Sequence, residues 1–165
     1  MNVESLVEQL FDPDADTRAG AAEQLCQIPD QLGPAADALL DVCQDEDERV
    51  REWAAAALES IETPSPRIAP LLTQRLTADN GLVAYWAATL LGRLGTAAAN
   101  AAPPLGELVA REDADRAARE RAAWALGRIG PPAAAAIQSL EAAAKSQHER
   151  LATLAKTALQ SVRAA

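Results

Sequence analysis

Apolar residues recur along this chain with the spacing of one helical face, and the same pattern returns about every 33 residues. Around Leu58, the apolar side chains of Val50, Ala54, Ala57 and Ile61 fall on one stripe of a helix. Leucines equivalent to Leu58 follow one another after 33, 33, 35 and 33 residues, at Leu25, Leu58, Leu91, Leu126 and Leu159. A fixed period of this size predicts an array of stacked units, because one such unit cannot bury its apolar face alone.

Each repeat is predicted to contain two helices. The first, helix A, has an acid-rich start that supplies N-caps, and it falls within 12–28, 45–61, 78–95, 113–130 and 146–162. A shorter helix B follows, with prolines near its start, and it centres on Leu39, Leu72, Leu105 and Leu140. Residues 2–11 predict a lone helix B, and residues 147–163 predict a lone helix A. We therefore expect one all-α domain over residues 1–165, with about ten helices in four full and two half repeats.

Short motifs within the repeats resemble the HEAT consensus. Asp12-Pro13-Asp14 and Val50-Arg51 match its first half, and Leu126-Gly127-Arg128-Ile129-Gly130 matches its end. The short period is most similar to that of the HEAT-like repeats of phycobilin lyases. This resemblance implies a right-handed α-α superhelix, a HEAT-like solenoid whose B helices line the concave side. It also implies a structural ladder between repeats, made by Arg18, Arg51 and Arg119 with the aligned acids Asp14, Asp47 and Asp115.

Charge is spread unevenly along the chain, whose net charge is −9. Residues 1–82 carry 17 acids and 5 bases, whereas residues 83–165 carry 7 acids and 10 bases. An acidic protein repels phosphate backbones, so we expect no nucleic-acid partner. The asymmetry favours weak head-to-tail association of monomers. No apolar run approaches the roughly 20 residues of a membrane span, and the first residues lack the basic start of a signal peptide, so a cytoplasmic protein without membrane contact is expected.

Candidate chemistry is sparse. His148 is the only histidine, so neither a nucleophile–histidine pair nor a multi-histidine metal site can be assembled without it. Cys43 aligns with a core leucine and is expected to be a buried apolar residue, while Cys26 is displaced toward solvent. The acidic run 45–49 is interpreted as a solvated turn between repeats. We expect no enzyme activity, no metal site and no cofactor.

The function favoured by these observations is a non-catalytic scaffold or adaptor that binds a protein or peptide on a solenoid surface. The alternative, implied by the resemblance alone, is a bilin-lyase-like or enzyme-accessory protein that holds a tetrapyrrole or another ligand. Such a protein needs an apolar or aromatic cleft with charged partners for the propionate groups.

Two surfaces are candidates for the partner. The far side of the B helices is predicted to present a lightly charged ridge of Asp37, Asp41, Arg67, Gln74, Asn100, Glu107, Gln138 and Lys145. The second candidate is the outer face around Tyr85 and Trp124, which are expected to be the more exposed aromatic residues. Trp53 and Trp86, five residues before their anchor leucines, are predicted to be buried packing residues.

Overall fold

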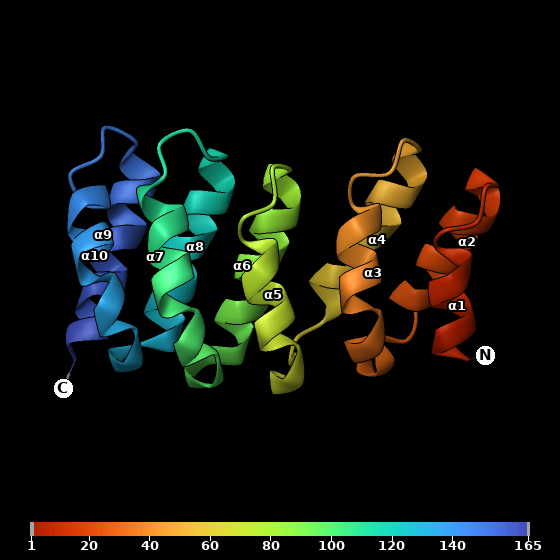
Figure 1. The fold of residues 1–165 in the computed structure, drawn as a ribbon, viewed down its shortest axis with the longest axis horizontal. Helices are drawn as coiled ribbons and strands as arrows, with labels where there is room; N and C mark the ends of the chain where they lie inside the picture. The colour runs from red at the N-terminus through yellow and green to blue at the C-terminus, as the bar shows by residue number, and fades with distance from the viewer. Residues whose placement is uncertain (1, 165) are drawn as a thin grey trace. The chain divides into compact units, whose positions relative to one another are not determined.

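Residues 2–164, which the computed structural model describes, fold into alternating long and short α-helices without a strand. The predicted A helices are α2 (Ala15–Cys26), α4 (Glu48–Ser60), α6 (Gly81–Leu94), α8 (Arg116–Ile129) and α10 (Glu149–Arg163). The predicted B helices are α1 (Val3–Gln9), α3 (Ala36–Val42), α5 (Ala69–Arg75), α7 (Ala102–Ala110) and α9 (Ile137–Ala143). The all-α series of four full and two half repeats is confirmed (Figure 1).

Contacts along the chain group it into two compact units, Met1–Pro64 and Ser65–Ala165. In the first unit, α2 packs against α1 and α4, and α3 packs against α4. In the second unit, α8 lies between α6 and α10, while α7 packs against both α8 and α9. Each unit therefore has one layer of A helices and one layer of B helices.

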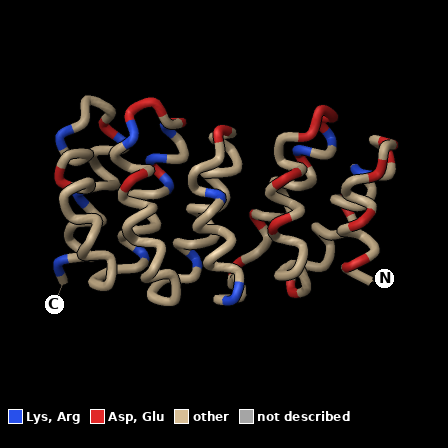
Figure 2. Tube along the Cα trace, in the orientation of Figure 1, with Lys and Arg blue, Asp and Glu red and all other residues tan. Residues whose placement is uncertain are grey.

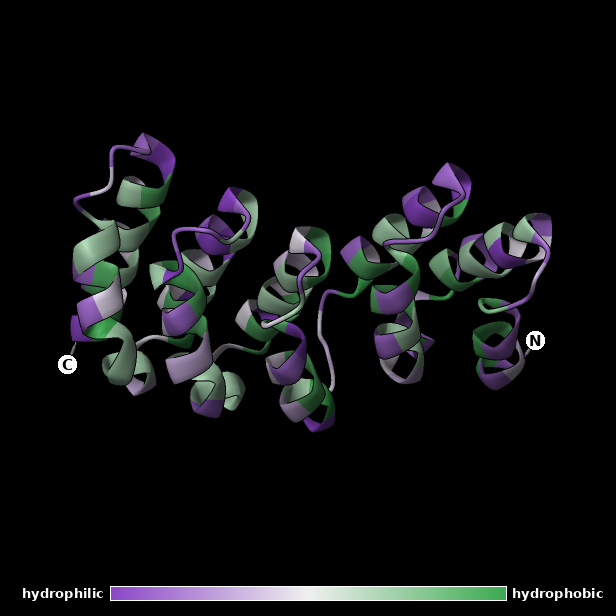
Figure 3. Ribbon diagram, turned by 45° about the horizontal axis from the view of Figure 1, so that its top comes forward, coloured by the Kyte–Doolittle hydropathy of each residue, from purple (hydrophilic) through white to green (hydrophobic). Residues whose placement is uncertain are grey.

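The aligned leucines form the core of each unit. Leu25, Leu58, Leu91 and Leu126 are completely buried, and only Leu159, on the last helix, retains 8% exposure. Full burial of a leucine side chain stabilises a fold by about 1.5–3 kcal/mol. The remaining core is largely alanine, which lets neighbouring helices approach closely. Hydrophilic residues gather in the turns that lead into the A helices (Figure 3).

Those turns supply the helix caps that the sequence predicts. The carboxylates of Asp14, Asp47 and Asp115 each accept a hydrogen bond of 2.9 Å from a backbone N–H in the first turn of α2, α4 and α8. Hydrogen bonds from Thr17 lower the pKa of Asp14 below its ordinary range. At the opposite ends of α6 and α8, Gly95 and Gly130 adopt positive φ angles of 56° and 73°, a conformation that favours glycine.

Candidate partner-binding site

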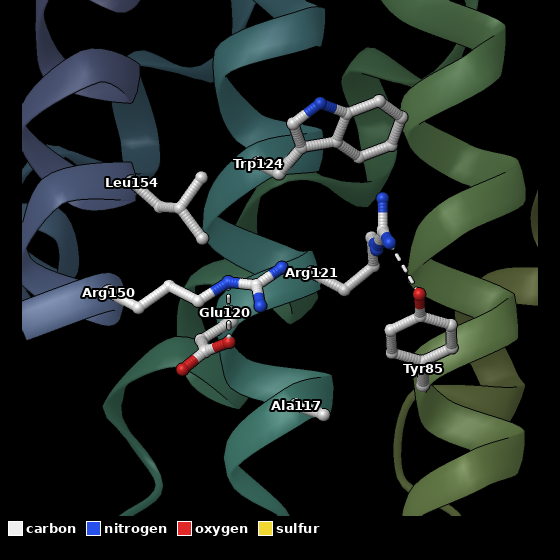
Figure 4. Close-up of a pocket in the computed structure, with 7 residues that line it drawn as sticks. All are labelled: Tyr85, Ala117, Glu120, Arg121, Trp124, Arg150 and Leu154. Carbon is white, nitrogen blue, oxygen red and sulfur yellow. Dashed lines mark hydrogen bonds and ion pairs between the residues drawn. The ribbon is translucent and has the colours of Figure 1, made fainter. Parts of the chain in front are cut away.

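The guanidinium of Arg121 lies between two aromatic rings on the A-helix layer of the second unit. Its central carbon is 4.7 Å from the ring centroid of Tyr85 and 5.0 Å from that of Trp124. A terminal N–H of Arg121 also donates a hydrogen bond to the Tyr85 hydroxyl (Figure 4). Cation–π contacts of this kind favour one position of the cation over others. Arg121 is therefore an oriented charge at the protein surface.

Helical spacing explains how one flank of α8 carries this cluster. Ala117, Arg121 and Trp124 follow at intervals of four and three residues, which places them on the same side of the helix. That side lies against α6, which contributes Tyr85. Tyr85 is itself held by an edge-to-face contact with Trp86, at 5.3 Å between centroids. The cluster is thus built on two packed helices rather than on loops.

A pocket of about 280 Å³ opens beside Arg121, and α10 forms its other wall. There Nε of Arg150 pairs with the Glu120 carboxylate at 3.2 Å, and Leu154 lies close to Trp124 (Figure 4). The complete lining is Tyr85, Ala117, Glu120, Arg121, Trp124, Arg150 and Leu154.

Two further hollows lie next to this pocket, between α8 and α10. One, of about 250 Å³, shares Trp124 and Leu154 and continues past Gly127 and Arg128. The other, of about 530 Å³, shares Glu120 and Arg150 and continues to Arg116. Because neighbouring hollows share lining residues, we call the three together the α8–α10 groove.

The unit that carries the groove is the basic one. Residues 65–165 contain 12 bases and 8 acids, whereas residues 1–64 contain 3 bases and 16 acids. Figure 2 marks acidic residues mostly along the N-terminal helices and basic residues mostly along the C-terminal ones. The groove therefore lies in a weakly positive environment within an acidic chain.

The predicted B-helix ridge divides between the two units, so each part is described separately. In the first unit, Asp37 and Asp41 of α3 are half-buried. In the second unit, the ridge residues are all exposed: Arg67, Gln74, Asn100, Glu107, Gln138 and Lys145. No aromatic side chain stands among them. A binding role for these residues stays a prediction.

The exposure of the aromatic residues corrects two predictions. Trp86 is buried, with 6% exposure, but Trp53 is 37% exposed, so the expectation that both are buried packing residues is wrong for Trp53. Tyr85 and Trp124 are half-buried and are not the more exposed pair. Trp53 and Trp86 share the position five residues before the anchor leucine, which we call the rim position, but the exposure of that position differs between α4 and α6. In α8 and α10 that rim position holds Arg121 and Leu154, which line the groove.

The predicted arginine ladder exists in a different form. Arg18 donates from Nε and Nη2 to both carboxylate oxygens of Asp45, at 2.8 and 2.9 Å, and from Nη1 to the Asp12 and Pro13 carbonyls. The expected partners Asp14, Asp47 and Asp115 are helix caps instead. The acidic run 45–49 is therefore not merely a solvated turn, since the Asp45 side chain is only 11% exposed.

Arg51 and Arg119 donate to backbone carbonyls, at 2.7 Å to Asp45 and 3.0 Å to Val109. The chain offers no acid for Arg51 at the position aligned with Asp45, because Ala78 stands there. All three aligned arginines thus have structural roles, but only Arg18 forms a buried ion pair between repeats. Asp45, the acid two residues before the cap Asp47, was the sequence feature that could have indicated this ion pair.

The remaining candidate chemistry lies outside the groove or at its edge. Cys43 is buried as predicted, and burial raises the pKa of its thiol to about 12, whereas Cys26 is half-buried. His148 is exposed at the start of α10, and its side chain makes no capping hydrogen bond. Residues 2–164 hold no group of three or more acidic, cysteine or histidine side chains placed to bind a metal ion. Within the same residues, every helix is too short or too polar to cross a membrane.

Several solved structures are similar to this chain. The complex of CpcE and CpcF, the phycocyanin lyase from Nostoc sp. PCC7120, gives a TM-score of 0.69 and 25% identity over 99% of this chain and 65% of that chain. An engineered protein gives a TM-score of 0.65 and 23% identity, over 98% of this chain and 80% of that chain. A computationally designed armadillo repeat protein for modular peptide recognition gives a TM-score of 0.61 and 19% identity, over 95% of this chain and 80% of that chain. The chain thus spans slightly less than two thirds of the lyase chain.

Sequence comparison gives the family directly. No curated protein sequence matches the chain. A family model described as HEAT repeats, however, matches residues 3–83 and again 68–160. The two matches together cover nearly all of the repeats seen in the structure. The chain belongs to the HEAT-repeat family.

Proposed function

We propose that this chain is a non-catalytic scaffold that binds a segment of a partner protein in the α8–α10 groove. The observation that carries the proposal is the placement of Arg121 between Tyr85 and Trp124, beside an open pocket. Arg, Tyr and Trp are the residue types that dominate the binding energy of protein interfaces. Because their side chains are already oriented, little conformational entropy is lost when a partner binds.

The dimensions of the groove suit the side chains of a peptide. The hollows beside Trp124 measure about 280 and 250 Å³, below the roughly 300–1,000 Å³ typical of small-molecule sites, whereas the hollow toward Arg116, of about 530 Å³, lies within that range. They follow one another along two helices, as the anchor pockets for successive side chains of a bound segment do. The designed armadillo protein made for peptide recognition supports this use of stacked helices, by analogy of fold alone.

The absence of catalysis is part of the proposal. The Cys43 thiol, with its pKa raised to about 12 by burial, stays protonated and is inaccessible to a substrate. His148 stands exposed and is not oriented by a hydrogen bond from its side chain. A general base needs such orientation beside a nucleophile.

A tetrapyrrole-holding role is the second candidate, favoured by the similarity to the CpcE–CpcF lyase complex. Arg121 and Arg150 offer cations for propionate groups, and Trp124 offers an aromatic wall. The pocket they share is small for so large a planar ligand. Titration of the purified protein with a bilin tests this role, which requires a shifted absorbance band that Trp124→Ala removes.

The B-helix ridge is the alternative surface for a protein partner. Its residues in the second unit are exposed, but they lack the large anchors that make hot spots. We therefore place the partner on the A-helix side, and we use the ridge as the comparison surface in the tests below.

Peptide display tests the proposed function. A random peptide library is selected against the wild-type protein, and the recovered peptides are resynthesised with a fluorescent label. We expect anisotropy titrations to show binding to wild type that Trp124→Ala weakens, while Trp53→Ala, which removes an exposed indole elsewhere, leaves it unchanged. Leu154→Ser, on the opposite wall, should weaken binding as well, and thermal melts confirm that each variant is folded. Peptides that bind all variants equally would refute the proposed site.

A further inference from the structure

We infer that the partner segment is acidic, and that one of its carboxylates binds Arg121 while a neighbouring apolar side chain contacts Trp124 and Leu154. This inference rests on the proposed function and names the chemistry of the partner. It follows from the hydrogen-bonding state of Arg121, from the charges along the groove and from the composition of the unit that carries them.

Arg121 has hydrogen-bond donors to spare. A guanidinium carries five N–H groups, and the bond to the neutral Tyr85 hydroxyl uses one of them. Among residues 2–164, no carboxylate forms an ion pair with Arg121. The buried Arg18 pair shows the contrast, because the Asp45 carboxylate there accepts two hydrogen bonds from one guanidinium. Arg121 lacks such a partner among the residues that the structure describes.

The surroundings of Arg121 prepare it for a planar anion. The rings of Tyr85 and Trp124 hold the guanidinium beside the opening of the pocket (Figure 4). The fork of a guanidinium matches the two oxygens of a carboxylate, and the resulting pair is stronger and more directional than one made by lysine. Trp124 supplies apolar surface next to this fork, and Leu154 lines the same pocket from α10. The geometry therefore suits an acidic residue that lies close to an apolar one.

The charges along the groove favour an anion in spite of one local acid. Glu120 lines the same pocket, but Arg150 pairs with it at 3.2 Å and offsets its charge. Arg116 and Arg128 stand toward the two ends of the groove, so its lining contains four arginines and two glutamates in all. The excess of positive charge attracts an acidic segment and disfavours a basic one.

Replacing the carboxylates of the peptide by amides tests this inference separately from the proposed function. Each recovered peptide is compared with a counterpart in which Asp and Glu are replaced by Asn and Gln. We expect the peptides that depend on Trp124 to be rich in acids, and the amide counterparts to bind about tenfold or more weakly, a change of about 1.4 kcal/mol. Arg121→Gln should cause a similar loss, Arg121→Lys should restore only part of the affinity, and the matched control Arg111→Gln should bind as wild type does.

Three outcomes would count against the inference, each with a different meaning. Peptides that depend on Trp124 but are indifferent to amide replacement overturn the acidic partner and leave the proposed site standing. If no recovered peptide depends on Trp124, the proposed site itself is refuted. If sedimentation shows dimers of the protein that Arg121→Gln abolishes, the acidic residues of a second copy occupy the groove, and the inferred partner protein is wrong.

Discussion

The indole ring of Trp124 on α8 lies against Gly92 on α6, in the space that a side chain at residue 92 would fill. A Cβ atom added to Gly92 would come within 2.8 Å of Cε3 of Trp124 and 3.0 Å of Cα of Ala125. Real Cβ atoms do not tolerate such contacts with a rigid ring and a backbone. The absence of a side chain at residue 92 therefore positions Trp124, and through it one wall of the candidate site.

Gly92→Ala should consequently destabilise the protein, although alanine is the better helix former. Overpacking at a tight contact costs about 1–3 kcal/mol. Gly20 in α2 is the matched control, because nothing lies within 4 Å of an added Cβ there. Gly20→Ala should stabilise by about 0.5–1 kcal/mol through helix propensity alone. Urea unfolding of the two variants measures whether each substitution lowers or raises the free energy of unfolding. A stabilised Gly92→Ala protein would show that α6 and α8 are not so closely packed.

The Arg18–Asp45 pair predicts how stability depends on pH. Hydrogen bonds from Arg18 lower the pKa of Asp45 below its ordinary value of 3.8, although burial acts in the opposite direction. Because the unfolded state holds the Asp45 proton more tightly, the pair stabilises the fold at neutral pH, and that stabilisation is lost as the pH falls through the lowered native pKa.

Asp45→Asn should therefore lower the melting temperature at pH 7, and the difference from wild type should shrink as the pH falls below about 4. Asp79→Asn, which removes an exposed acid, controls for net charge. A difference between Asp45→Asn and wild type that is constant with pH would mean that Arg18 does not act on the ionised carboxylate.

The two tryptophans at the rim position should differ in their contribution to stability. Trp86 is 6% exposed, so Trp86→Ala should cost about 3–5 kcal/mol of the free energy of unfolding. Trp53 is 37% exposed, and Trp53→Ala should cost distinctly less. Chemical denaturation compares the variants, and equal losses would imply that Trp53 is buried in solution.

Thiol reactivity provides an independent check of the core. With its pKa raised to about 12 by burial, the Cys43 thiol should not react with a disulfide reagent at pH 8 while the protein is folded. The half-buried Cys26 should react first. Counting the thiols modified before and after denaturation, with Cys26→Ser to isolate Cys43, measures the difference. Rapid modification of Cys43 in the folded Cys26→Ser protein would contradict the packing of α3.

The repeats could be predicted from the sequence because every unit uses the same few rules. A leucine stripe at helical spacing recurs in every repeat, and an acid at the helix start and a proline or glycine at the boundaries recur in most repeats. These are local features. Even the two extra residues of the third interval lie in the turn between α7 and α8, as the alignment of the repeats predicts. Stacking follows, since each unit leaves an apolar face uncovered.

The candidate site could be predicted only in part, because it depends on which residue of one repeat meets which residue of the next. The sequence pointed to Tyr85 and Trp124 as a second surface but missed Arg121 between them, together with Arg150 and Leu154. A usable signal existed in Gly92, the small residue that admits Trp124. For the same reason the Arg18–Asp45 pair was missed, since it links positions 27 residues apart that no single helical pattern relates.

The central claim is that a partner binds the α8–α10 groove, and amide chemical-shift mapping with a recovered peptide tests it most directly. We expect the largest shifts on α8 and α10, with the indole N–H of Trp124 among the most affected signals and Arg121→Gln reducing them. The amide signals of the B-helix ridge in the second unit, such as those of Gln74, Glu107 and Gln138, should barely shift. Shifts confined to that ridge, with the Trp124 signal unchanged, would contradict the account.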